Sequence, residues 1–131
     1  FIQIPLTMEF KIDTKDAFTI IMPINDAIDA NLAVALQEKC TQMRQSGSKN
    51  FIIDMENCAK MNKNVVDGLV ALHEECYGLD ESIVFTGINK QGIEVLKENE
   101  TDLLINMAPT MKEAIDIISM EILERDLFSE E

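Results

Sequence analysis

The stretch from Phe51 to Leu72 places the strongest constraint on the fold of this chain. A short, continuous apolar run at 51–53 is followed by Asp54, a polar loop and an amphipathic stretch. The short run predicts a buried strand, and apolar residues recurring every three or four positions predict a helix. Asn62 and Asn64 are candidate N-caps for that helix, because an Asn side chain can accept from the unpaired N–H groups that open it. The stretch therefore predicts a strand, a polar loop and a helix, with a functional site in the loop.

The same alternation continues along the rest of the chain. Strands are predicted at 8–12, 18–22, 51–53, 82–86 and 103–106. The first two strands form a hairpin around the turn-forming residues 13–16. Helices are predicted to open near Asp29, Asn62, Ile88 and Pro109, with Pro109 in the first turn of the last one. The predicted fold class is α/β: an initial β-hairpin, then alternating βα units that form a mostly parallel central sheet with about four flanking helices.

Charge and length restrict the classes of partner. A chain of 131 residues with 47% hydrophobic residues forms one folded domain. Eleven Lys and Arg against 24 Asp and Glu give a formal net charge of −13, which phosphate backbones and anionic lipid headgroups repel. No apolar run approaches the roughly 20 residues that span a bilayer. We therefore expect a protein partner, no nucleic acid and no direct membrane insertion.

Cysteine and histidine usage argues against cofactor and enzyme chemistry. Cys40, Cys58 and Cys76 are odd in number and lack CxxC spacing, which disfavours a disulfide framework or structural zinc and fits a reducing cytoplasm. Cys40 and Cys76 fall on apolar helix faces, where buried small residues are expected. His73, the single histidine, has no nucleophile paired with it by spacing, and GxxxxGKS/T, GxGxxG, HExxH and GxSxG are absent. We expect a cytoplasmic protein without enzymatic activity, cofactor or metal.

The chain ends are expected to lie outside the domain. Residues 1–7 lack the basic start and the small-residue cleavage site of a signal peptide, so they are interpreted as an N-terminal extension or a cloning remnant before Met8. The domain is expected over 8–124. Residues 125–131 are expected to form an acidic C-terminal tail.

Three segments, in this order, resemble the STAS domain family, which comprises bacterial anti-sigma factor antagonists and cytoplasmic domains of sulfate transporters. Residues 26–30, Asp-Ala-Ile-Asp-Ala, are similar to the family's Gly-x-Leu-Asp-x loop, with Asp26 at the usual glycine. Residues 51–54 resemble its hydrophobic strand that ends in Asp. Residues 61–65, Met-Asn-Lys-Asn-Val, resemble the switch motif, hydrophobic-Asp-Ser-Ser/Thr-Gly, which starts the second helix. The resemblance covers about 8–118 and implies a STAS-like (SpoIIAA-like) fold.

The switch motif differs from the family pattern at its phosphorylation site. In the family, a partner kinase phosphorylates the second hydroxyl residue of the motif and so ends binding to an anti-sigma factor. Asn64 occupies that position here, Lys63 replaces the preceding Ser, and Asn62 replaces the usual Asp. Because Asn has no hydroxyl to accept a phosphoryl group, the resemblance implies a binding surface without its usual switch.

The resemblance implies a regulatory protein-binding module that acts by competition or complex assembly. Its expected partner class is a serine kinase-type anti-sigma factor, and self-association stays open. Two alternatives remain: a scaffold subunit of a signalling or ABC-type lipid transport complex, and a small-ligand or nucleotide-binding module with a pocket between sheet and helices. The expected partner-binding residues are Asp26, Asp29, Asn62, Lys63, Asn64 and Val65.

Structural roles compete with these functional ones. Asp29 is a good N-cap, and capping alone explains either Asn62 or Asn64. Asp54 is expected to hydrogen-bond the backbone of the loop that follows it. His73 is expected to be partly buried in the helix stripe.

Overall fold

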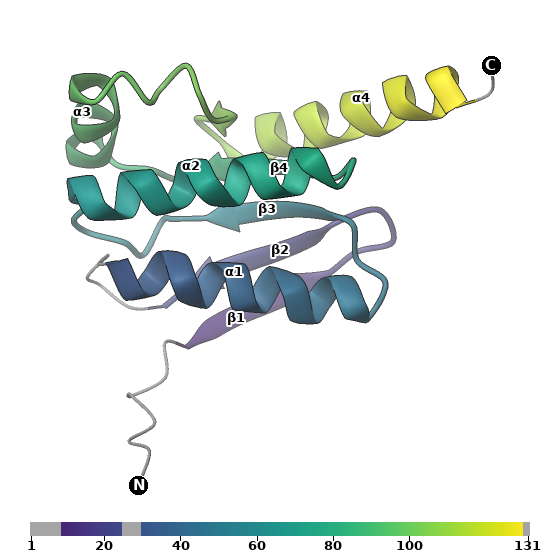
Figure 1. The fold of residues 1–131 in the computed structure, drawn as a ribbon, viewed down its shortest axis with the longest axis horizontal. Coiled ribbons are helices and arrows are strands. Elements are labelled where there is room, and N and C mark those ends of the chain that lie inside the picture. Colours follow the sequence, from purple (N-terminus) through teal and green to yellow (C-terminus); the bar gives the residue numbers. More distant parts are fainter. Residues whose placement is uncertain (1–8, 25–29, 130–131) are drawn as a thin grey trace, which may run out of the picture.

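A five-stranded sheet covered by helices on both faces forms the fold (Figure 1). The computed structural model describes residues 9–24 and 30–129. Their elements, in chain order, are β1 (Phe10–Thr14), β2 (Thr19–Pro23), α1 (Ala30–Gln45), β3 (Asn50–Asp54), α2 (Lys63–Gly78), β4 (Ser82–Thr86), α3 (Lys90–Glu98), β5 (Met107–Ala108) and α4 (Met111–Ser129). The strand order is β1-β2-β3-β4-β5, with β1 antiparallel to β2 and the other pairs parallel. The predicted α/β fold with an initial hairpin is confirmed.

The hairpin strands lie one to two residues later than predicted. A turn closed by a 2.8 Å hydrogen bond from Lys15 N to Phe18 O sets the register, in which Thr14 pairs with Thr19. Pro23 ends β2 opposite Phe10. A proline is tolerated there because Ile24 N makes the next bond to β1, donating to Glu9 O at 3.0 Å, and the pairing of β2 with β3 ends at Ile21.

The predicted strand at 103–106 is wrong. Residues 102–104 form a turn, with Leu104 N donating to Thr101 O at 2.8 Å, and Leu103 is 89% exposed. Pairing with β4 begins only where Phe85 N donates to Asn106 O. The two adjacent leucines produced a strand-like apolar run without a neighbouring strand to cover it.

The last helix begins at Met111, whereas the sequence predicted Pro109 within its first turn. Thr110 caps α4, because its Oγ1 accepts from Glu113 N at 3.2 Å and its carbonyl accepts from Ala114 N. Pro109 therefore precedes the cap instead of occupying the first turn. Residues 125–129, expected in a tail, continue this helix to Ser129.

Two apolar cores lie on opposite faces of the sheet. Phe51 and Ile53 of β3 face the core that is shared with α1 and α2, whereas Ile52 points to the core under α4. This division follows from the alternation of side chains along a strand. All five residues of β3 are buried, as expected for a central strand covered on both faces.

The cysteines are part of the larger core. Cys40, Cys58 and Cys76 are all buried, so the predicted burial of Cys40 and Cys76 on their helices is confirmed. Among the described residues, no helix has the length and apolarity needed to cross a membrane.

Candidate functional site: the loop between β3 and α2

The loop from 55 to 62 begins with a tight turn at the carboxyl end of β3, the edge at which open α/β sheets place their sites. Asp54 is buried, and its Oδ1 accepts from Glu56 N at 3.0 Å. This confirms the expected role of Asp54 toward the loop backbone. Gly87 lies against the turn with φ +75°, and a Cβ there would come within 2.7 Å of Asp54 Oδ1. Only glycine fits both the backbone angle and the space.

Two amides at the start of α3 hold the second half of the loop. Asn89 Nδ2 donates to Ala59 O at 2.7 Å, and its Oδ1 caps α3 by accepting from Gly92 N at 2.8 Å. Gln91 Nε2 donates to Met61 O, and its Oε1 accepts from Met61 N, both at 2.9 Å. The loop is therefore fixed to α3 at two points before α2 begins.

The start of α2 presents the residues of the predicted switch motif. Asn62 is the N-cap, with φ −124° and ψ 172°, and its Oδ1 accepts from Val65 N at 3.1 Å. Lys63 and Asn64 follow as exposed residues of the first turn. Capping thus accounts for Asn62, one of the two predicted caps, and leaves Asn64 exposed beside Lys63.

Val65 cannot serve as a partner contact through its side chain. Its exposed fraction is 0%, and it belongs to the core between the sheet and the helices. The motif places Val65 next to the exposed residues in sequence, but the helix turns its side chain inward. The exposed surface of the motif consists of Asn62, Lys63 and Asn64.

The expected contribution of Asp26 and Asp29 lies outside the described residues. The helix that follows them, α1, begins at Ala30 and meets α2 at close range. A Cβ on Gly68 would lie 2.2 Å from Ala33 Cβ, so glycine is needed where the two helices touch. The first turn of α1 therefore packs against the second turn of α2.

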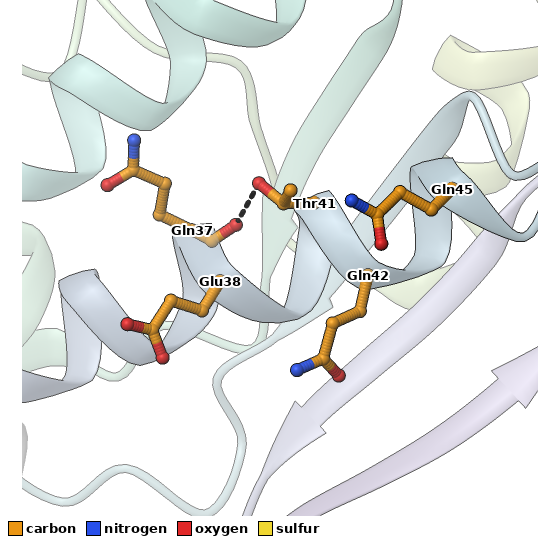
Figure 2. A pocket seen from close by; sticks show the side chains of 5 residues that line it. All are labelled: Gln37, Glu38, Thr41, Gln42 and Gln45. Atoms are coloured by element: carbon orange, nitrogen blue, oxygen red, sulfur yellow. Dashed lines mark hydrogen bonds between the residues drawn. The ribbon is translucent and has the colours of Figure 1, made fainter.

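The described surface also has hollows away from this loop. Figure 2 shows one on the outer face of α1, of about 400 Å³, lined by Gln37, Glu38, Thr41, Gln42 and Gln45. All five belong to one helix, and Thr41 Oγ1 donates to the Gln37 carbonyl at 3.0 Å. The hollow pairs no nucleophile with a base.

His73 is packed where the sequence placed it. Its ring lies 4.5 Å from that of Tyr77, its Nε2 is buried without a hydrogen-bond partner, and burial lowers its pKa. The partly buried structural environment predicted for His73 is confirmed. Within residues 9–24 and 30–129, no three His, Cys, Asp or Glu side chains gather in a group that could hold a metal ion.

Asn89 and Gln91 were not found by sequence reasoning. Asn89 carries a recognisable signal, since an Asn before an amphipathic stretch is a typical N-cap. Gln91 has none, because its backbone partner Met61 lies 30 residues away in sequence.

Comparisons with known proteins agree with this architecture. The STAS domain model matches residues 9–114. A putative anti-sigma factor antagonist from Thermotoga maritima has a TM-score of 0.73 at 14% identity, over 84% of this chain and 94% of that chain. An anti-sigma factor antagonist from Mycobacterium paratuberculosis has a TM-score of 0.72 at 14% identity, over 90% and 99%.

A third similar structure comes from the stressosome, a signal integration and transduction hub. Its TM-score is 0.64 at 18% identity, over 83% of this chain and 96% of that chain. No curated protein sequence matches this chain. The match of the family model over most of the sequence, together with these folds, leads to one assignment: the chain belongs to the STAS domain family.

Proposed function

We propose that this chain is a non-enzymatic regulatory module that binds another protein through the first turn of α2, with contributions from Asp26 and Asp29, which precede α1 in sequence. The observation that carries the proposal is the exposed Asn64 beside Lys63 on a helix start that Asn62 caps. In a chain with a net charge of −13, Lys60 and Lys63 place two basic side chains close to Asn64 in sequence. Basic side chains attract a partner surface that carries acidic groups.

Binding at this surface is not switched by phosphorylation of the usual residue. No Ser, Thr or Tyr occurs between Ser48 and Tyr77, so the loop and the first turns of α2 contain no hydroxyl. A phosphate would add about −1.5 to −2 charges at the helix start. The helix field tolerates an anion there, so a phosphate acts on the partner rather than on the fold. A neutral Asn64 keeps the surface in the charge state of an unmodified hydroxyl.

The partner class that fits this proposal is a serine kinase-type anti-sigma factor. Two of the solved relatives are named anti-sigma factor antagonists or putative ones, which supports a function in competition or complex assembly. A regulator that binds an anti-sigma factor of this class works in the cytoplasm.

The loss of the switch is tested by incubation with the cognate kinase and ATP. Wild-type protein is expected to carry no phosphate in the 58–70 peptide. Asn64→Ser restores a hydroxyl at the same place and is expected to accept phosphate there if the kinase docks on this surface. Stoichiometric phosphate in the wild-type peptide contradicts the claim.

The binding surface is tested by affinity capture from the native organism with wild-type and Asn64→Asp protein. Asp in the first turn of a helix is compatible with folding, because it interacts favourably with the helix dipole. The carboxylate is expected to weaken capture of the partner about tenfold through repulsion of acidic groups. Gln45→Glu adds the same charge to an exposed residue at the other end of α1 and is expected to leave capture unchanged. Equal capture by all three proteins contradicts the proposed surface.

A scaffold role in a signalling assembly is the second candidate, favoured by the similarity to a stressosome chain. A scaffold subunit is expected to elute from native extracts in a large complex that also contains copies of itself. A regulator that pairs with one anti-sigma factor elutes as a small complex. Size-exclusion chromatography of the tagged protein from native cells separates the two.

A further inference from the structure

Helix α4 extends past the sheet that it covers. Its 19 residues span about 28 Å, whereas a five-residue strand spans about 17 Å. Its fully buried residues, Ala114 and Ile118, both lie in its first half. Figure 1 shows the C-terminal turns of α4 projecting beyond the rest of the fold.

The projecting half carries a second apolar stripe on its outer side. Met120, Leu123 and Leu127 are 62%, 60% and 58% exposed. Their spacing of i, i+3 and i+7 corresponds to heptad positions a, d and a, the anchors by which a helix packs against partner helices. A helix with apolar residues on two opposite sides typically packs against neighbours on both of those sides.

Polar anchors on the inner side fix the rotation of α4 and therefore the direction of this stripe. Glu121 accepts from Tyr77 OH and from Ser82 Oγ, both at 2.6 Å. Arg125 Nη2 donates to Ser82 Oγ at 2.5 Å and Nη1 donates to Asn50 Oδ1 at 3.4 Å. Because these contacts come from both β3 and β4, the outer stripe is presented on a helix that is held against the body.

The charges beside the stripe select among possible occupants. With Met120 at position a, Glu124 takes position e and Asp126 takes position g, the positions that set partner choice in coiled coils. Pairing with a second copy, parallel or antiparallel, would place these acids against further acids. An anionic membrane is repelled for the same reason.

We propose that the outer stripe of α4, formed by Met120, Leu123 and Leu127, docks onto a helical partner protein whose apolar stripe is flanked by Lys or Arg at e and g. This surface is separate from the start of α2, since α4 packs on the opposite face of the sheet. The two helices would pack through their apolar stripes, with the basic residues of the partner next to Glu124 and Asp126 of α4.

The test uses a synthetic helical peptide of about three heptads with Leu at a and d and Lys at e and g. A second peptide has Glu at e and g. Fluorescence anisotropy is expected to show binding of the Lys peptide to the protein and none of the Glu peptide. The double variant Leu123→Ser with Leu127→Ser keeps every charge and is expected to weaken binding about tenfold or more, because it removes two apolar anchors.

The matched control is the double variant Leu103→Ser with Leu104→Ser, which removes two exposed leucines from the turn before β5. It is expected to bind the Lys peptide as wild type does. Circular dichroism is expected to show the same thermal midpoint for both double variants and wild type. Equal binding of the Lys peptide by wild type and the α4 variant overturns the proposal, because attraction would then be electrostatic alone.

Two other outcomes also overturn it. Sedimentation velocity that detects a dimer, abolished by the α4 variant, assigns the stripe to a second copy of this chain. Flotation with phosphatidylcholine vesicles, abolished by the same variant, assigns it to a lipid surface.

Discussion

Gln91 on α3 contacts both backbone polar groups of Met61, accepting from its N–H and donating to its carbonyl at 2.9 Å each. The amide side chain thus makes both backbone hydrogen bonds that a neighbouring strand would make to a residue of a sheet. Since Met61 immediately precedes the cap Asn62, this pair sets the position at which α2 begins.

Replacing Gln91 by Glu is expected to loosen the loop without changing its shape. A carboxylate still accepts from Met61 N but cannot donate to the Met61 carbonyl, so the variant is expected to lose about 1–2 kcal/mol of unfolding free energy in urea. Amide exchange of Met61 is expected to accelerate. Gln45→Glu, with the same change of charge, is expected to stay within about 0.5 kcal/mol of wild type. Equal losses in the two variants would show that charge, not the lost donor, is responsible.

Gly68→Ala is expected to destabilise the protein although alanine favours helices. The new Cβ would lie 2.2 Å from Ala33 Cβ, so α1 and α2 must separate, with an expected net loss of about 1–3 kcal/mol. Ala33→Gly in the same chain removes the obstructing methyl and is expected to recover most of the loss in a double-mutant cycle. Gly78→Ala, where nothing lies within 4 Å, is expected to be neutral or slightly stabilising. Additive effects of the changes at 33 and 68 would contradict this contact.

The thiols are expected to be inert while the protein is folded. Burial raises the pKa of Cys76 to about 12 and also raises the pKa of Cys40. At pH 8 the thiolate fraction of Cys76 is then about one in ten thousand, and the sulfur is inaccessible. Ellman's reagent is expected to react slowly with native protein and to titrate three thiols in denaturant. One rapidly reacting thiol in the native protein would contradict the burial of all three.

His73 is expected to make stability fall on the acid side. Burial lowers its pKa in the folded protein, against opposing effects of Glu121 and Glu74. The unfolded chain therefore binds the proton more tightly, and the contribution of His73 is fully present above pH 6.5 and is lost as the pH falls toward the folded pKa. His73→Phe keeps a ring against Tyr77 and removes this titration.

The measurement is the difference in unfolding free energy between wild type and His73→Phe in urea from pH 7.5 to pH 5. Wild type is expected to lose stability relative to the variant over this interval. At pH 7.5 the variant is expected to be at least as stable, because it also removes a buried nitrogen without a partner. Parallel pH profiles of the two proteins would contradict the assignment.

The elements that could be predicted from sequence are those whose local pattern has a single interpretation. The run from Ser82 to Thr86 coincides with β4, because a short β-branched stretch bounded by turn residues packs well only as a buried strand. Leu103 and Leu104 produced the same local signal but lie in a turn. Both leucine side chains are exposed instead of packed against a neighbouring strand. The local sequence does not show this difference.

The residues of the candidate site also differ in whether the sequence alone could predict their roles. Asn62 could be identified as a cap because a cap acts within three residues of itself. The periodicity of helix α2 turns the Val65 side chain inward. The motif instead groups Val65 with exposed residues, so these two sequence signals disagree. The contact between Gln91 and Met61 depends on how α3 packs against the loop, so it requires the tertiary fold.

The division of the helices between the two faces of the sheet has a consequence for assembly. The start of α2 belongs to one face and the stripe on α4 to the other, so the two proposed partners would not compete for the same surface. Two partners held on the same domain would meet at a raised effective concentration, which favours a contact between them. A chain with both proposed surfaces would act as an adaptor whose output depends on which of its two sides is occupied.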